Sequence, residues 1–319
     1  MGDNIQIMIV MVVYMLAVIG IGLAFAKRAN ESPEAYFLGG RTLGPWVTAM
    51  SAEASDMSGW LLMGLPGVAY WCGIADAAWT AIGLALGTYM NWLITSKRLR
   101  RYSEKAGNAI TLPEFFSNRF HEKGKLVMTI SAFFILVFFT VYAASCLVTC
   151  GKLFSTLFGL DYVPMMIVGA VFVLVYTIIG GFLAESASDF MQSIVMIVAL
   201  VVIVIAGTVA AGGLNAVLDN ARSIPGFLDF FGVATPVTVD GVQQAVGGVP
   251  QFGAAGSYGF LSILSTLAWG LGYFGMPQVL LRFMAIRNEH ELTRSRRIAT
   301  VWVVISLTVA VFIGVIGRA

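Results

Sequence analysis

The stretch SAEASDMSGW, residues 51 to 60, places two carboxylates and three serine hydroxyls inside a long apolar run. Glu53 and Asp56 lie three positions apart, so a helix would present them on nearly the same face. An ionised side chain costs at least about 2.5 to 3.5 kcal/mol at the centre of a membrane helix, and acids found there usually belong to a functional site. If the run lies in a membrane, these residues predict a site that binds a charged species.

The composition indicates a membrane protein. Of the 319 residues, 58% are apolar and only 11% are charged, whereas soluble domains carry about 25% charged residues. This excludes a soluble enzyme. The net charge of +2 is small, and the basic residues gather in short connecting segments, so no nucleic-acid partner is expected.

The cysteines and histidines give no sign of a catalytic or metal centre. Cys72, Cys146 and Cys150 show neither a disulfide framework nor metal-ligand spacing, and we interpret them as small packing residues. His121 and His290 lie in charged connecting segments. We therefore expect no enzyme activity and no cofactor.

Eight apolar runs are long enough to cross a membrane, because a span needs about 20 residues. The first lacks a clear cleavage site and is interpreted as a retained helix rather than a signal peptide. The runs lie near residues 5–26, 43–70, 74–95, 126–150, 163–183, 190–213, 256–285 and 298–317.

The distribution of basic residues predicts the orientation, because lysine and arginine collect on the cytoplasmic side. With the N-terminus outside, sixteen of the nineteen fall in cytoplasmic segments and the others in outer ones. The three on the outer side are Lys152, Arg222 and Arg318. The long outer connection spans residues 214–255, and its role is open.

Two of the eight runs contain several helix breakers. The second run holds Gly44-Pro45, Ser58-Gly59 and Pro66-Gly67, and the seventh holds Trp269 to Pro277 with three glycines. Interrupted helices at matching positions of two halves indicate the midplane site of an inverted-repeat transporter, although glycine can also serve close helix packing. We expect one repeat over residues 43–213 and the start of a second over 256–319, so the chain is predicted to be truncated.

Three segments identify the resemblance: FLGGRTLGPWVTAMSAEASDMSGWLLMGLPG from Phe37, YTIIGGFLAESASDF from Tyr176 and WGLGYFGMPQVLLRFMA from Trp269. Over essentially the whole chain the sequence resembles the sodium:solute symporter family, in particular its proline-carrying branch, and corresponds to roughly the first eight of thirteen helices. The resemblance implies an all-α, LeuT-like inverted-repeat core with one extra N-terminal helix. It also implies sodium-driven uptake of L-proline by alternating access, with sodium as coupling ion, across the plasma membrane of a bacterium.

The resemblance also assigns the ion site. Asp56 matches an acid that the family needs for sodium coupling, and Ala54 and Met57 match positions whose backbone carbonyls face the ion where the helix unwinds. In the family, hydroxyls of the ninth helix complete the coordination. That helix would follow residue 319, so we expect these 319 residues alone not to transport.

The substrate residues follow in the same way. Ser58 and Gly59 match positions at the substrate, where free N–H groups at a half-helix start can hold a carboxylate. The side chains expected around the proline come from two further segments, and aromatic faces there would attract its ammonium group. They are Tyr142, Trp269, Tyr273 and Pro277.

Three charged residues are candidates for gating or the ion path. Arg41 matches a family position at the cytoplasmic end of its helix, but ordinary positive-inside placement explains it equally well. Asp189 matches the acid of a Thr-Asp pair, here Ser188-Asp189, while the neighbouring Glu185 departs from the family pattern. Glu53 is a departure too: it can hold a proton, line an aqueous path or pair with a cation such as Arg41.

Two alternatives remain. The first is a symporter of the same family for pantothenate, a sugar or a carboxylate. The second is the membrane sensing domain of a larger signalling protein. An ion channel or a membrane enzyme is disfavoured, because neither a repeated filter nor a catalytic triad is visible.

Overall fold

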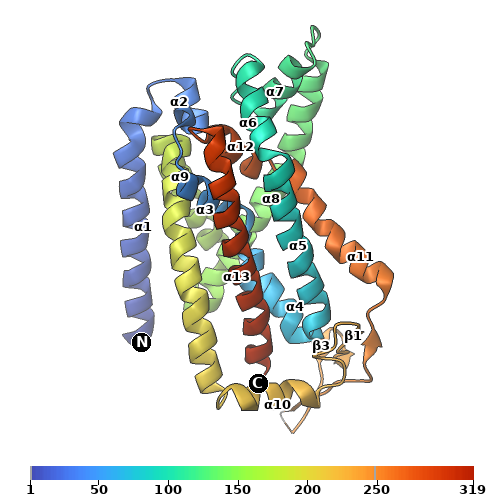
Figure 1. The fold of residues 1–319 in the computed structure, drawn as a ribbon. Helices are drawn as coiled ribbons and strands as arrows, with labels where there is room; N and C mark the ends of the chain where they lie inside the picture. The colour runs from blue at the N-terminus through green and yellow to red at the C-terminus, as the bar shows by residue number, and fades with distance from the viewer. Residues whose placement is uncertain (1, 248) are drawn as a thin grey trace. The chain divides into compact units, whose positions relative to one another are not determined.

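The computed structural model describes residues 2–247 and 249–319, which form helices and three very short sheets. Figure 1 shows the elements coloured along the chain. The chain divides into two compact units, which are described separately below. Unit 1 comprises residues 1–56, 93–192 and 276–296, and unit 2 comprises residues 57–92, 193–275 and 297–319.

Unit 1 is built from helices and short 3-10 turns, and its interior contains buried arginines as well as apolar side chains. Its elements are α1 (Gly2–Ala29), α2 (Pro33–Leu38), the 3-10 turn η1 (Gly39–Arg41), α3 (Pro45–Asp56), α6 (Ser96–Lys105), α7 (Leu112–Arg119), α8 (Leu126–Phe158), the first part of α9 (Tyr162–Ala210), α12 (Pro277–Ala285), the 3-10 turn η4 (Glu289–Glu291) and the start of α13 (Leu292–Arg318).

Unit 2 holds the remaining helices and all of the strands in the described residues. Its elements are the π-turn η2 (Trp60–Gly64), α4 (Leu65–Cys72), most of α5 (Ile74–Ile94), the end of α9, α10 (Leu214–Ser223), β1 (Gly232–Val233), β2 (Thr238–Val239), β3 (Val242–Gln243), β4 (Ala245–Val246), β5 (Val249–Pro250), β6 (Gly256–Ser257), α11 (Phe260–Ala268), the 3-10 segment η3 (Trp269–Gly275) and the rest of α13.

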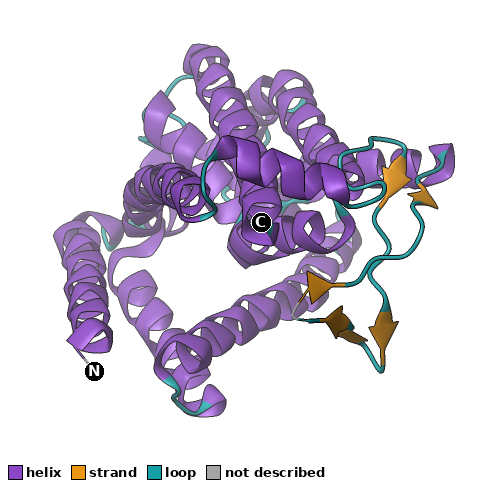
Figure 2. Ribbon diagram, turned by 90° about the horizontal axis from the view of Figure 1, so that it is seen from below, coloured by secondary structure: helices purple, strands orange, loops and turns teal. Residues whose placement is uncertain are grey.

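The connection between α10 and α11 contains the six strands. They pair in antiparallel twos, β1 with β6, β2 with β3 and β4 with β5, and Figure 2 shows them as short arrows. A small apolar cluster packs this connection against the helices of unit 2. Phe227 is fully buried in it, together with Val217, Ala234 and Val315. The sequence predicts a loop here, because two-residue strands leave no periodic signal that could reveal them.

The number of membrane spans stays a prediction. Within the described residues, four helices are long and apolar enough to cross a membrane, or five if the bent pair on either side of Met276 is one span. The fifth and sixth predicted runs, 163–183 and 190–213, are joined without a linker in the 49-residue α9. Its helical backbone is interrupted at Gly181, which has φ 55° and ψ −156°. A left-handed φ suits glycine, and a Cβ there would lie 2.8 Å from the Tyr36 carbonyl oxygen.

Both helices predicted to be interrupted are interrupted, as expected. In the first, α3 ends at Asp56, Met57 is non-helical, and the π-turn η2 follows. In the second, α11 passes into the 3-10 segment η3, and Met276 takes the extended conformation before Pro277 starts α12. π-turns and mid-helix 3-10 segments often mark functional positions.

Glycines hold η3 directly against α5 within unit 2. A Cβ built at Gly270 would overlap the carbonyl oxygen of Gly83 and the Cα of Gly87. The backbones therefore touch, as in other close contacts between membrane helices.

Gly270→Ala is expected to destabilise the fold, whereas Gly272→Ala in the same segment is not. The first Cβ meets backbone that cannot move aside, at a cost of about 1 to 3 kcal/mol, while the second meets nothing within 4 Å. The measurement is the melting temperature of each purified variant in one detergent, where we expect a drop of several degrees for Gly270→Ala only. Equal melting temperatures would mean that α5 and η3 are not in backbone contact.

Candidate functional site

The break after α3 presents the residues predicted for sodium. Ala54 and Asp56 lie in its last turn, and Asp56 is partly exposed. Met57 is buried, with 3% of its surface exposed, and its carbonyl accepts a hydrogen bond of 3.2 Å from the Leu61 N–H. A carbonyl oxygen has two lone pairs, so this bond leaves one for another ligand.

Ser58 and Gly59 link the break to the π-turn. Ser58 has a positive φ of 25°, which is uncommon for a residue with a side chain, and its hydroxyl accepts a bond of 3.2 Å from the Trp60 N–H. The Trp60 indole covers Gly64, where a Cβ would overlap the ring. The break is thus held in a specific, strained shape, which is typical of ligand sites.

One predicted substrate residue, Trp269, contacts this turn within unit 2, and a second, Tyr273, follows it in the same segment. The rings of Trp60 and Trp269 are in edge contact, with centroids 4.7 Å apart at 60°. Trp269 is half exposed, while Tyr273 is buried and its carbonyl accepts a bond of 2.9 Å from the Asn91 side chain. Unit 2 therefore brings the Trp269 indole next to the segment that follows Ser58 and Gly59.

Tyr142 and Pro277 belong to unit 1. The Tyr142 hydroxyl donates a long hydrogen bond of 3.5 Å to the carbonyl of Ser55, beside the end of α3. Pro277 occupies the start of α12, where a missing N–H costs nothing. Each unit thus supplies part of the predicted substrate set, and the assembly of the six residues into one site stays a prediction.

A buried ion-pair cluster joins α3, α9 and α12 in unit 1. The Arg282 guanidinium, 2% exposed, donates to Asp189 and to Glu185, both at 2.9 Å, and to the Ser51 hydroxyl at 3.0 Å. The same Asp189 oxygen accepts bonds from Ser51 at 2.7 Å and Ser55 at 2.9 Å. Charge-assisted bonds of this kind are roughly twice as strong as neutral ones, so the cluster ties three helices together.

Arg282 was not among the predicted site residues, although it lies at the centre of this cluster. From the sequence it counted only as a cytoplasmic positive charge, but its place inside an apolar run was a signal of a functional or paired charge. Glu185, which appeared as a departure from the family pattern, is one of its partners. The hydroxyl of Ser188 is buried and has no hydrogen-bond partner in the described part of the chain, so of the Ser188-Asp189 pair only Asp189 joins this cluster.

Arg41 is a buried hub and not a simple surface charge. It donates to the side chains of Glu34, Ser103 and Asn108, and to the carbonyls of Met284 and Ala109, over distances of 2.8 to 3.2 Å. Burial lowers the pKa of Arg41, and the nearby Arg100 guanidinium lowers it further, whereas Glu34 opposes the shift. Arginine nevertheless stays charged at physiological pH. Arg41 thus fixes α2, α6 and α12 to one another. Glu53 is buried, with 2% of its surface exposed, and its function stays undecided.

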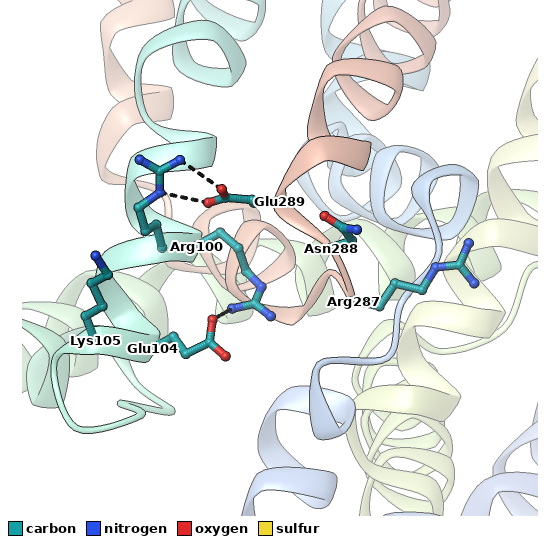
Figure 3. A pocket seen from close by; sticks show the side chains of 7 residues that line it. Arg100, Glu104, Lys105, Arg287, Asn288 and Glu289 are labelled. Carbon is teal, nitrogen blue, oxygen red and sulfur yellow. Dashed lines mark hydrogen bonds and ion pairs between the residues drawn. The ribbon is translucent and has the colours of Figure 1, made fainter.

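A charged cavity of about 570 Å³ lies beside this hub, between α6 and the η4 turn (Figure 3). Arg101 makes two bonds to Glu289, at 2.8 and 2.9 Å, while Arg100 bonds Glu104 and the Ile286 carbonyl, both at 2.8 Å. Most of its cationic groups already face carboxylates. We interpret the ion pairs around this cavity as structural contacts that hold α6 against η4.

Comparisons with known proteins identify the family of the chain. The model of the sodium:solute symporter family matches residues 36–319. A sodium/proline symporter of Staphylococcus aureus strain USA300 / TCH1516 is 41% identical over 316 residues, which cover 99% of this chain and 57% of the relative; the one of strain JH9 gives the same identity and coverage. The chain thus spans little more than half the length of these relatives.

A solved structure shares the fold. The substrate-bound, outward-open state of a Na⁺-coupled sialic acid symporter matches with a TM-score of 0.72 and 18% identity, over 95% of this chain and 58% of the other. At this identity the likeness concerns the fold alone.

Proposed function

The chain belongs to the sodium:solute symporter family, and from this membership we propose that it carries L-proline into the cell together with sodium. It is a multi-pass membrane protein of a transporter family and not an enzyme. The observation that carries the proposal is the 41% identity to sodium/proline symporters over 99% of the chain.

The proposed architecture is a LeuT-like core of two inverted repeats, preceded by one extra helix and placed in the plasma membrane with the N-terminus outside. Residues 43–213 would form the first repeat and residues 256–319 the start of the second. The interruptions at Met57 and Met276 support this, because corresponding broken helices are the mark of such repeats.

In the proposed mechanism, Asp56 and the carbonyls of Ala54 and Met57 bind sodium, and Ser58 and Gly59 hold the solute carboxylate at the same break. A cation at this position would neutralise the partly exposed Asp56 carboxylate and favour the shape of the break in which solute binds. This links the two affinities reciprocally. Tyr142, Trp269, Tyr273 and Pro277 would surround the pyrrolidine ring and its ammonium group.

The proposal is tested by uptake of labelled L-proline in a transport-deficient bacterial strain that expresses the complete gene. We expect uptake that requires an inward sodium gradient and that unlabelled proline inhibits. Pantothenate, a sugar and a carboxylate serve as competitors. Inhibition by one of these and not by proline would assign a different solute, and uptake independent of sodium would contradict the coupling ion.

Trp269→Ala is expected to weaken proline binding about 10-fold and to leave sodium affinity nearly unchanged. The indole is half exposed and stacks its edge on Trp60, and loss of a cation–π contact in a partly desolvated site costs about 1 to 2 kcal/mol. The measurement is the apparent affinity for each ligand in the same membranes. The matched control is Trp71→Ala, an exposed tryptophan in α4. Parallel losses for proline and sodium would indicate misfolding instead.

A further inference from the structure

Unit 2 contains an open polar cavity whose lining, apart from Trp269, has no part in the proposed mechanism. Its volume is about 670 Å³, and it lies between the start of α5 and helix α11, with Trp269 on its wall. The polar groups in its lining are one carboxylate, four hydroxyls and the indole, namely Asp76, Tyr258, Ser262, Ser265, Thr266 and Trp269. One acid, several hydroxyl oxygens and an aromatic face are the groups that bind an organic cation.

Asp76 is not merely a surface acid. It lies in the first turn of α5, and its Oδ1 accepts a hydrogen bond of 2.9 Å from the hydroxyl of Tyr258, which follows strand β6. The Tyr258 hydroxyl also lies 2.9 Å from the Thr266 hydroxyl in α11. A residue of the connecting loop therefore links two helices of unit 2 at the cavity.

The cluster of Asp76, Tyr258 and Thr266 has fewer hydroxyl hydrogens than hydrogen-bond contacts. Tyr258 meets Asp76 and Thr266, and Thr266 also donates to the Ser262 carbonyl, so three contacts each need one hydrogen. A phenol and a hydroxyl carry one hydrogen each, and a carboxylate carries none. The single hydrogen of the Tyr258 phenol therefore cannot serve both Asp76 and Thr266. The cluster therefore presents acceptor oxygens and lacks one donor.

We propose that this cavity is an entry site for the ammonium group of the solute, with Asp76 as its counter-charge and the Tyr258 and Thr266 hydroxyls as acceptors. A secondary ammonium has two N–H donors and one positive charge, which match the missing donor and the carboxylate. Leu261 and Trp269 offer the apolar and aromatic wall for the ring. The identity of the solute rests on the function proposed above; the cation preference of the cavity does not.

The cation preference can be measured without transport. Ser265 lines the cavity and is exposed, so a cysteine is placed there after Cys72, Cys146 and Cys150 are replaced by serine. A cationic and an anionic thiosulfonate of similar size are reacted with Ser265→Cys in permeabilised cells, and each rate is divided by that reagent's rate with a free thiol. We expect the cation to react about fivefold faster, as a charge several ångströms away would produce in a partly solvated site.

Two second-site variants make this measurement specific. Asp76→Asn is expected to abolish the preference, while Asp240→Asn, which removes an equal charge from the turn between β2 and β3, is expected to preserve it. Asp76→Glu is expected to retain it. Equal normalised rates of the two reagents in the parent protein, or a preference that survives Asp76→Asn, would overturn the proposal whether or not the protein transports proline.

The ligand is tested by protection. L-proline is expected to slow modification of Ser265→Cys, and cyclopentanecarboxylate, which has the ring and carboxylate but no ammonium, is expected to have no effect. In uptake by the complete protein, Asp76→Asn is expected to raise the KM for proline about fivefold and to leave kcat unchanged. Protection by sodium but not by proline, or equal protection by both ring compounds, would overturn the assignment to the ammonium group. Absence of proline uptake by the parent protein would count against the proposed function only.

Discussion

Arg282→Met is expected to destabilise the protein strongly, by about 3 kcal/mol, because it leaves two carboxylates without their shared cation in a buried cluster. The side chain of Arg282 is 2% exposed and that of Asp189 13%, whereas Glu185 is 36% exposed and partly solvated. This solvation places the expected cost at the low end of the range for broken buried pairs. The measurement is the melting temperature and the free energy of unfolding of the purified protein.

Arg101→Met is the matched control, because it removes an ion pair with nearly the same donor–acceptor distances from a solvated position. Arg101 and Glu289 are joined by two bonds of 2.8 and 2.9 Å, but the Arg101 side chain is 55% exposed. Such surface pairs contribute about 0 to 1 kcal/mol. A similar loss in both variants would show that burial is not what makes Arg282 important.

Two further variants test the pairing of Arg282 with Asp189 and the importance of the guanidinium geometry. Arg282→Met combined with Asp189→Asn is expected to recover part of the stability, because the second change removes the carboxylate that the first leaves unpaired. Arg282→Lys keeps the charge but loses the forked donor geometry, and is expected to fall between the parent and Arg282→Met. Additive losses in the double variant would contradict the direct pairing of Arg282 with Asp189.

The comparison of sequence and structure shows which features each can reveal. The break at Met57 was predictable, because glycine, serine and proline interrupt an apolar run whose period is otherwise helical. The family resemblance pointed to the same residues. Local chemistry therefore located the candidate site along the chain.

The contacts of the site were not predictable in the same way. Arg282 and Asp189 are 93 positions apart, and their pairing depends on how α12 packs against α9, which no local pattern specifies. Arg41 was expected to be an ordinary cytoplasmic charge or a gate, and its five hydrogen-bond partners come from segments spread over residues 34 to 284. The contact between Asp76 and Tyr258 was not predictable either, because the two residues are separated by a connection whose strands have no sequence signal.

Asp56→Asn is expected to reduce the apparent sodium affinity about 100-fold while the protein still folds. The change removes the negative charge that is proposed to bind the ion and keeps the size and shape of the side chain. Loss of a close charge–charge contact in a partly buried site is worth about 3 kcal/mol, and every 1.4 kcal/mol corresponds to about tenfold in affinity. The measurement is proline uptake by the complete protein as a function of sodium concentration, with the amount of folded protein checked in the same membranes.

Glu53→Gln is the matched control, since it makes the same carboxylate-to-amide change three residues earlier in α3. Glu53 is 2% exposed, whereas Asp56 is partly exposed, so the control removes the same charge from a more deeply buried position of the same helix. We expect the sodium affinity of Glu53→Gln to equal that of the parent, which would leave Glu53 outside the coupling site. Equal losses in both variants would mean that the two acids bind the ion together, and an unchanged Asp56→Asn would remove Asp56 from the proposed site.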